Sequence, residues 1–348
     1  MAKITIDDIT FEVPDGTTIL QAARMMGGDM VPPAMCYYSK LKETGGFCRS
    51  CLVKVEKGSE KDPRPMPKLV PSCKTTVMDG MEVRNNTSPE VVEARAGVVE
   101  FLLKNHPLDC PVCDQAGECD LQNLSYSHGK ATTRYEFERR TYDPIDIGDK
   151  IKLHMNRCIL CYRCVKVADQ ITDGRVHGVM NRGEVSEIST YIEQAIDNDF
   201  SGNVIDVCPV GALTDRTFRF KSRVWFTRPV EAHRDCPKCS GKVRLWYQGE
   251  EILRVTARKD KYGEVEEFIC NDCRFEHKHT KDWTIEGPSK ISHQSVISQN
   301  HYEFDDSKLR EKMRQEMIMA EGQHIRQELG EAHLNPNNQR PGKILDKK

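Results

Sequence analysis

Fifteen cysteines stand in four groups whose spacings are those of metal ligands. A Cys-x2-Cys separation places two thiols on one tight turn, where both sulfurs can bind the same ion or cluster. The chemistry that such thiolates offer is electron transfer through iron-sulfur clusters or the structural binding of zinc. A disulfide framework is the alternative, and the tight spacings argue against it, as does an N-terminus unlike a signal peptide. The groups are Cys36, Cys48, Cys51 and Cys73; Cys110, Cys113 and Cys119; Cys158, Cys161, Cys164 and Cys208; and Cys236, Cys239, Cys270 and Cys273.

The first group has the order Cys-x11-Cys-x2-Cys, followed by the distant Cys73. It is similar to the plant-type [2Fe-2S] pattern, except that the first spacing exceeds the usual one of about four residues, so we expect an enlarged loop. Gly45 and Gly46 precede Cys48. Glycines here would let backbone N-H groups approach the cluster sulfurs closely, which stabilises an added electron. A zinc site is the alternative for these four cysteines alone.

The second group has only three cysteines, which is one ligand fewer than a four-iron cluster needs. An external ligand or a nearby imidazole must supply the fourth bond, and His106 is the candidate closest to Cys110, Cys113 and Cys119. Imidazole in place of thiolate removes one negative charge from the cluster. We therefore expect a raised reduction potential at this site.

The third group contains the run of a bacterial [4Fe-4S] ferredoxin, Cys158, Cys161 and Cys164, but Ala168 occupies the fourth place. In two-cluster ferredoxins each run lends its last cysteine to the other cluster, and Cys208, followed by proline, is the surviving last member of a second run. Counting back from Cys208 by the same spacing gives Val204, Ser201 and Asn198. The sequence thus predicts one [4Fe-4S] cluster, bound by the three cysteines of the run and by Cys208.

The fourth group consists of two Cys-x2-Cys turns, in DCPKCSGK and ICNDC. Zinc ribbons use such turns between strands, because proline and glycine direct backbone N-H groups at the thiolates. A further [4Fe-4S] cluster is the functional alternative. The metal at Cys236, Cys239, Cys270 and Cys273 is therefore open between zinc or a single iron and a cluster, with zinc slightly favoured from spacing.

Composition excludes several other functions. Lys and Arg number 51 against 53 Asp and Glu, so the chain offers no basic field for nucleic acid. The most apolar windows, such as residues 91–103, are interrupted by charges, and any membrane contact is expected to be indirect. We find no GxGxxG or GxxxxGK[ST] nucleotide fingerprint and no Ser-His-Asp arrangement. Electrons would have to enter and leave through other chains, and the chain is expected to stay in the cytoplasm.

The elements that must position these groups predict an α+β protein. Residues 1–85 are expected to form a β-grasp [2Fe-2S] ferredoxin domain, with strands in IDDITFEV, CLVKV and MEV. An Asp15-Gly16 turn and a helix through ILQAARMM, beginning after Thr17 or Thr18, complete this unit. Residues 86–145 predict a helical domain for the second group, opened by Ser88 as N-cap and Pro89. The buried face of that helix is expected to include Val91, Val92, Arg95 and Val99.

The remainder of the chain is expected to form three smaller parts. Residues 146–220 predict a bacterial-ferredoxin-like [4Fe-4S] domain whose segments are too short for a large core, so the metal must hold much of it together. Residues 221–285 predict a small β-rich four-cysteine domain with strands in VRLWYQ, EEILRVTA and EVEEFIC. Residues 286–348 predict a polar tail, in which a helix at roughly residues 305–330 either docks on a partner or stays solvated.

The order of these motifs resembles a known family. An N-terminal [2Fe-2S] unit, then HPLDCPVCDQAGECDLQ, then RCILCYRC with a distant CPVGALTD closely resembles the large iron-sulfur subunits of bacterial NADH-quinone oxidoreductase, respiratory complex I, over residues 1 to about 285. The resemblance implies a [2Fe-2S] site at the first group, a [4Fe-4S] site with one histidine ligand at the second and an all-cysteine [4Fe-4S] site at the third. It places the latter two on the route from flavin towards quinone.

The resemblance also implies the setting of the chain. The chain would be a subunit of a proton-translocating NADH:ubiquinone or menaquinone reductase and by itself an electron carrier, with no side chain acting as acid, base or nucleophile. Its partners would be a subunit that binds flavin and NADH and other peripheral-arm subunits. It would lie peripherally at the cytoplasmic face of the bacterial inner membrane, with membrane contact only through partner subunits.

Two departures from the family pattern stand out. Some members carry a further cluster on CxxCxxxC plus a distant cysteine, whereas Val243 occupies the third position here, so that Cys273 replaces it or the site has become zinc. The family usually continues into a large molybdopterin-enzyme-like domain, and we expect a short form without it.

Two rival functions are open. The diaphorase iron-sulfur subunit of an NAD-linked hydrogenase or formate dehydrogenase shares the first two groups but usually keeps both ferredoxin clusters, so Asn198, Ser201 and Val204 argue against it. A zinc-stapled scaffold without a redox role would be colourless, and the ferredoxin run argues against it.

Overall fold

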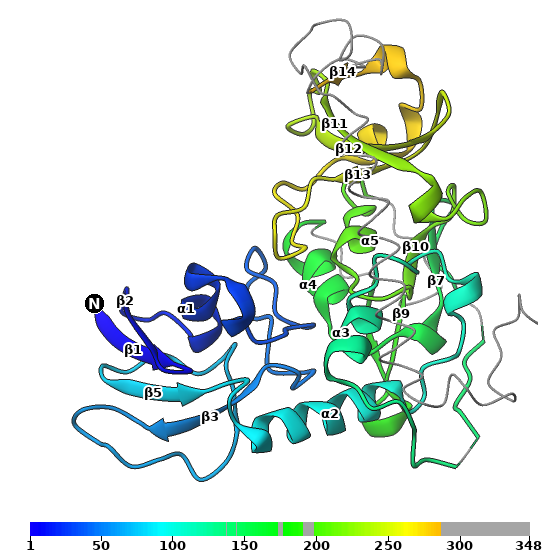
Figure 1. Ribbon diagram of the computed structural model, residues 1–348. Coiled ribbons are helices and arrows are strands. Elements are labelled where there is room, and N and C mark those ends of the chain that lie inside the picture. Colours follow the sequence, from blue (N-terminus) through cyan, green and yellow to red (C-terminus); the bar gives the residue numbers. More distant parts are fainter. Residues whose placement is uncertain (137, 144, 173–176, 191–197, 287–348) are drawn as a thin grey trace, which may run out of the picture. The chain divides into compact units, whose positions relative to one another are not determined.

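The computed structural model of the protein describes residues 1–136, 138–143, 145–172, 177–190 and 198–286 (Figure 1). The chain divides into two parts, residues 1–287 and 288–348, and the helix expected at about 305–330 lies outside the described residues. All fifteen cysteines are described and free, so the disulfide framework is excluded. Within the described ranges, no helix is both long and apolar enough to cross a lipid bilayer.

The N-terminal region contains a five-stranded mixed sheet in the order β2-β1-β5-β3-β4. Its strands are β1 (Ala2–Ile6), β2 (Ile9–Val13), β3 (Leu52–Lys57), β4 (Val70–Pro71) and β5 (Met81–Arg84). β1 pairs antiparallel with β2 and parallel with β5. The segment IDDITFEV, expected as strand, contains the hairpin turn of β1 and β2, because Asp7 and Asp8 adopt positive φ there.

Helix α1 (Ile19–Met26) covers this sheet and begins at Thr18, as predicted. The Thr18 side chain accepts a hydrogen bond from the Gln21 N-H at 3.3 Å, while the Gln21 side chain accepts one from the Thr18 N-H at 2.9 Å. This capping box satisfies two N-H groups that the helix cannot. The apolar face of α1 is buried with sheet residues in one cluster, which includes Ile4, Val13, Ile19, Ala22, Val53 and Val83. A short 3-10 turn, η1 (Gly28–Met30), follows the helix.

The next region contains α2 (Pro89–Leu103), the 3-10 turn η2 (Cys110–Val112) and α3 (Asp120–His128). The expected face of α2 is partly wrong: Val91 and Val99 are buried, but Val92 is 47% exposed. Arg95 is buried as expected, because its guanidinium donates to the Leu52 carbonyl at 2.8 Å. Pro89 begins the helix, whereas the Ser88 side chain makes no capping hydrogen bond.

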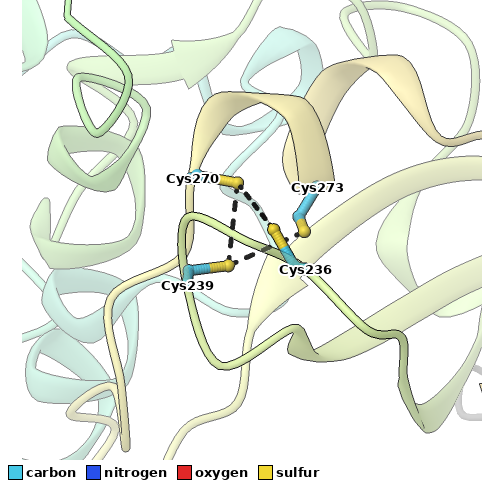
Figure 2. Close-up of side chains that lie close together, drawn as sticks. All are labelled: Cys236, Cys239, Cys270 and Cys273. Carbon is cyan, nitrogen blue, oxygen red and sulfur yellow. Dashed lines mark hydrogen bonds between the residues drawn. The ribbon is translucent and has the colours of Figure 1, made fainter.

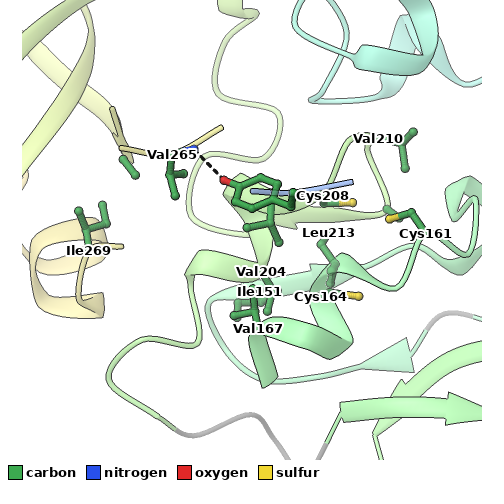
Figure 3. Packing of buried hydrophobic residues seen from close by; sticks show 14 of the residues in the cluster. Ile151, Cys161, Cys164, Val167, Val204, Cys208, Val210, Leu213, Val265 and Ile269 are labelled. Carbon is green, nitrogen blue, oxygen red and sulfur yellow. Dashed lines mark hydrogen bonds between the residues drawn. The ribbon is translucent and has the colours of Figure 1, made fainter. Parts of the chain in front are cut away.

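The third region is held by two small sheets and two short helices. The three-stranded sheet has the order β10-β7-β6, and β8 pairs with β9. A buried cluster between these elements contains Ile151, Val167, Val204 and Leu213 (Figure 3). The elements are β6 (Ile145–Asp146), β7 (Ile151–Leu153), η3 (Met155–Arg157), α4 (Arg163–Gln170), β8 (His177–Met180), η4 (Gly183–Val185), β9 (Glu187–Thr190), α5 (Asn203–Val207) and β10 (Leu213–Asp215).

The fourth region is built on a sheet in the order β13-β12-β11-β14. The predicted strands VRLWYQ and EEILRVTA are confirmed as β12 and β13, but the strand predicted in EVEEFIC is wrong. Only an isolated bridge, between Lys259 and Val265, forms there, since Glu264 binds Arg24 and Ser39 and the chain then enters a cysteine turn. The elements are η6 (Val224–Phe226), β11 (Arg228–His233), β12 (Lys242–Gln248), β13 (Glu251–Ala257), the π-helical turn η7 (Asp272–Glu276), η8 (Thr280–Asp282) and β14 (Thr284–Ile285). The mixture of sheets and helices confirms the α+β class.

Candidate metal centres

The first cysteine group forms two close pairs. The Cys51 and Cys73 sulfurs lie 3.3 Å apart, and Cys36 and Cys48 are hydrogen-bonded through their side chains. All four thiols are buried, in the loop before β3 and the turn after β4. Since each iron of a two-iron cluster binds two thiolates, a pair of pairs is a ligand set for two irons.

Backbone N-H groups point at these sulfurs. The Gly46 N-H donates to Cys73 Sγ at 3.2 Å and the Phe47 N-H to Cys36 Sγ at 3.3 Å. Gly45 has a φ of +92°, and a Cβ there would lie 3.1 Å from Cys73 Sγ. The predicted close approach of the glycine backbone to sulfur is therefore confirmed, and such donors stabilise negative charge on a bound cluster.

The third group lines one cavity. Cys158, Cys161, Cys164 and Cys208 share it with apolar side chains that include Leu153, Ile188 and Leu213. Figure 3 shows three of these thiols at the edge of the buried apolar cluster. The loop is unusual because Leu160 and Tyr162 have positive φ, which costs about 1 kcal/mol per residue but directs the Leu160 N-H to Cys158 Sγ at 3.3 Å.

Burial makes these thiols poor acids. It raises the pKa of Cys161 to about 12 and also raises the pKa of Cys158, Cys164 and Cys208. Four thiolates in one apolar cavity need a compensating positive charge, which a metal cluster supplies. The donor set therefore fits an iron-sulfur cluster.

The second group surrounds the short turn η2 and the start of α3. His106 has a buried Nδ1 without a hydrogen-bond partner among the described residues. Burial, helped by the charge of Arg157, lowers the pKa of His106 to about 4, so the ring is neutral at pH 7. A neutral, unpartnered imidazole nitrogen beside Cys113 and Cys119 fits a metal ligand. His154 and His177 also have partnerless buried nitrogens, so position, and not burial alone, distinguishes His106.

Arg163 connects the first group with the third, which the sequence did not predict. Its guanidinium donates to the Tyr37 carbonyl at 2.8 Å, beside Cys36, and to the Val207 carbonyl at 3.4 Å, beside Cys208. The rings of Phe47 and Tyr162, from the same two loops, meet edge to face at 4.8 Å. A buried Arg with three carbonyl contacts is the signal in the structure, whereas its position between cysteines looks like an ordinary surface charge in the sequence.

Pro209 and Gly211 connect the third group with the second. The Pro209 carbonyl accepts a hydrogen bond from the Asp120 N-H at 3.1 Å and lies 3.8 Å from Cys119 Sγ. A Cβ on Gly211 would lie 2.1 Å from Cys113 Sγ, so only glycine fits there. The groups are thus neighbours in the order first, third, second, which differs from their order along the chain.

We expect Arg163→Met to lower the reduction potential of a cluster at the third group, on the order of tens of millivolts, because a buried positive charge favours the reduced, more negative form. An EPR-monitored redox titration measures this. Arg163→Lys keeps the charge and should restore most of the potential; equal potentials in the Met variant and the wild type would contradict the assigned role.

The fourth group brings its four sulfurs within 4.8 Å of one another (Figure 2). The Sγ distances are 3.6 Å for Cys236 to Cys270, 3.6 Å for Cys239 to Cys270 and 3.7 Å for Cys239 to Cys273. One pair comes from the loop between β11 and β12 and the other from the turn that begins η7. Among the described residues, this is the one set of at least three metal-binding side chains with all its ligand atoms this close together.

Three known domain families match consecutive parts of the chain. The 2Fe-2S iron-sulfur cluster binding domain matches residues 1–88, and the NADH-ubiquinone oxidoreductase-G iron-sulfur binding region matches residues 95–134. The ferredoxin-like domain of NADH-quinone oxidoreductase subunit 3 matches residues 148–214. The folds and the cysteine groups thus define an iron-sulfur protein with cluster-binding domains of more than one type.

Within that class, the chain is similar to the large iron-sulfur subunits of NADH-quinone oxidoreductase. It is 40% identical to the NADH-quinone oxidoreductase-G protein of Rickettsia bellii and 40% identical to the NADH-ubiquinone oxidoreductase 75 kDa subunit of Reclinomonas americana, over 83% of its own length in both cases. It is 39% identical over 82% of its length to the mitochondrial NADH dehydrogenase [ubiquinone] iron-sulfur protein 1 of Solanum tuberosum. The chain spans 40%, 40% and 37% of the lengths of these relatives.

A solved structure shares the fold. A chain in the crystal structure of an NAD+-reducing [NiFe]-hydrogenase in the H2-reduced state superposes with a TM-score of 0.55 over 64% of this chain and 91% of its own length. At 24% identity, this likeness shows a common fold alone.

Proposed function

We propose that the chain is an electron-relay subunit of an NADH:quinone oxidoreductase, passing electrons from an NADH- and flavin-bearing partner towards quinone. The observation that carries the proposal is the contact between successive cysteine groups, through Arg163 on one side of the third group and Pro209 on the other. The relatives named as subunits of such oxidoreductases support it.

The proposed cofactors are one [2Fe-2S] cluster and two [4Fe-4S] clusters, which supply one-electron redox centres when bound. The chain's own side chains bind and tune them. Backbone N-H donors and Arg163 stabilise negative charge, and His106 contributes a neutral ligand. The ligands would be Cys36, Cys48, Cys51 and Cys73 for the first; His106, Cys110, Cys113 and Cys119 for the second; and Cys158, Cys161, Cys164 and Cys208 for the third.

Electrons would pass between the groups in their spatial order, with the third group between the first and the second. Electron tunnelling falls steeply with distance, so direct contacts decide which step is fast. The backbone from Cys208 to Gly211 serves both halves of this route, because it follows a ligand of the third group and packs against two sulfurs of the second.

The setting proposed for the chain follows from this role. Its partners would be the flavin- and NADH-binding subunit and other peripheral-arm subunits, with no nucleic acid. It would lie peripherally at the cytoplasmic face of the bacterial inner membrane, contacting the membrane only through partner subunits. The proposed domains are a β-grasp ferredoxin domain, a histidine-ligated cluster domain, a ferredoxin-like domain, a four-cysteine domain and a polar tail, at residues 1–85, 86–145, 146–220, 221–285 and 286–348.

A diaphorase subunit of an NAD-linked hydrogenase is the second candidate, and the shared fold with the hydrogenase chain favours it. It is weaker because Asn198, Ser201 and Val204 cannot bind the second ferredoxin cluster that such subunits usually keep.

Metal analysis of the full chain, purified without oxygen, tests the proposal. We expect about ten irons and matching acid-labile sulfide in one [2Fe-2S] and two [4Fe-4S] clusters, with separate EPR signals on reduction. A colourless protein without iron would overturn the relay. A chain whose clusters are not reduced by NADH in the presence of its flavin-bearing partner would do so as well.

A further inference from the structure

We propose that Cys236, Cys239, Cys270 and Cys273 bind a single zinc ion, and that this ion braces the segment that supplies Cys208. Four thiolates around one tetrahedral zinc, at Zn-S distances of about 2.3 Å, lie about 3.8 Å apart. The observed separations of 3.6 to 3.7 Å match that value. A four-iron cluster puts each cysteine on a different iron, which spreads the sulfurs further than a shared ion does.

The two turns also have the local structure of a zinc site (Figure 2). The Gly241 N-H donates to Cys239 Sγ at 3.4 Å, and the N-H groups of Lys238 and Cys239 point at Cys236. Gly241 has a φ of +68°, and a Cβ there would lie 2.0 Å from the Arg234 carbonyl oxygen, so the turn requires glycine. Donated N-H groups stabilise the negative charge that four thiolates leave around a divalent ion.

The second turn grips the segment before Cys208 through Asn271, which lies between Cys270 and Cys273. The Asn271 amide nitrogen donates to the Asn198 carbonyl at 2.8 Å and to Ser201 Oγ at 3.0 Å. Its Oδ1 accepts a hydrogen bond from the Gly202 N-H at 2.9 Å. One side chain between two metal ligands thus fixes three residues of this segment.

Further buried contacts extend the grip towards Cys208. Asn203 exchanges hydrogen bonds with the Ile269 backbone, at 2.8 and 3.1 Å. Arg274, which follows Cys273, forms an ion pair with Asp206 in which both side chains are almost completely buried. Breaking a buried pair of this kind is costly, so the segment and the turn must stay in register.

The bracing falls where the second ferredoxin run has lost its cysteines. Asn198 and Ser201, two of the positions that lack cysteine, are the positions that Asn271 contacts. A metal-stapled turn outside the segment therefore stabilises what a second cluster would have stabilised from inside. The zinc assignment stands independently of the relay, whereas the bracing of a cluster rests on the proposed role of Cys208.

Metal content and X-ray absorption of the full chain test the site. The protein is produced with iron and zinc supplied equally and is purified without oxygen. We expect one zinc per chain with four sulfur neighbours at about 2.3 Å. About eleven irons without zinc would overturn the assignment in favour of a single iron, and about fourteen in favour of a cluster. Zinc in a chain without iron would refute the relay but support the zinc site.

Two variants test the bracing. Cys236→Ala combined with Cys239→Ala should lose the zinc, retain the [2Fe-2S] EPR signal, and broaden or lose the signal of the third group. Asn271→Ala should keep the zinc while the third signal changes and amide exchange in residues 198–207 becomes faster, and it serves if the double variant does not fold. Lys238→Met, which removes exposed ion pairs to Asp199 and Asp272, is the matched control and should change neither. Unchanged third signals in both test variants would overturn the bracing.

Discussion

Cys208→Ala should remove the cluster of the third group and interrupt electron passage between the first and second groups. Cys208 is the one ligand of this set that lies far from the Cys158–Cys164 run, and its thiol is buried, so water cannot easily replace it. With the middle centre absent, the remaining centres are too far apart for fast tunnelling. We expect four irons fewer per chain and NADH-to-quinone electron transfer reduced by at least about a hundredfold.

Val210→Ala is the control for this prediction. Val210 is also buried, lies two residues away and lines the same cavity, but it has no thiol. Loss of its methyl groups costs about 1.5 kcal/mol of folding free energy and should leave the iron content unchanged. If Cys208→Ala retained all the iron and a normal EPR spectrum, Cys208 would not be a ligand.

His106→Cys should lower the reduction potential of the second cluster on the order of 100 mV or more, because thiolate restores the negative charge that imidazole removes. The imidazole of the wild type is neutral at working pH, since burial holds the pKa of His106 at about 4. The cluster should still assemble, with four cysteine ligands. An EPR-monitored redox titration of the full chain measures the shift.

His154→Cys provides the matched control. His154 is another partly buried imidazole with a partnerless Nδ1, and the charges of Arg157 and Asp109 act on both rings. It lies outside the second cysteine group, so its replacement should leave the potential of the second cluster unchanged. A shift of equal size in both variants, or in neither, would show that His106 is not the ligand.

Local signals in the sequence predicted much of the framework. The helix after Thr18 follows from a capping pair three residues apart, and β12 and β13 follow from alternation. Cysteine pairs on one turn are likewise local, because two residues between them fix the distance between the thiols. Features set by neighbours along the chain can therefore be inferred from the chain alone.

Features set by distant neighbours could not be predicted. Val92 has the right spacing for the buried face of α2 but is 47% exposed, since burial depends on what packs there. The strand predicted in EVEEFIC fails because Glu264 is drawn to Arg24 and Ser39, more than 200 positions away in the chain. For the same reason, neither the role of Arg163 nor the spatial order of the cysteine groups is visible in the sequence.

The wide separation of the residues that build the third group affects the order in which a ribosome can deliver a finished protein. The ligands of the first group are all synthesised by residue 73, so this site can close early. The third group waits for Cys208, and its support waits for Asn271 and Arg274. Between those points the Cys158–Cys164 run is translated but incomplete, and oxidation of its thiols would block maturation. We expect assembly in cells to depend on keeping these thiols reduced until the last third of the described chain has emerged.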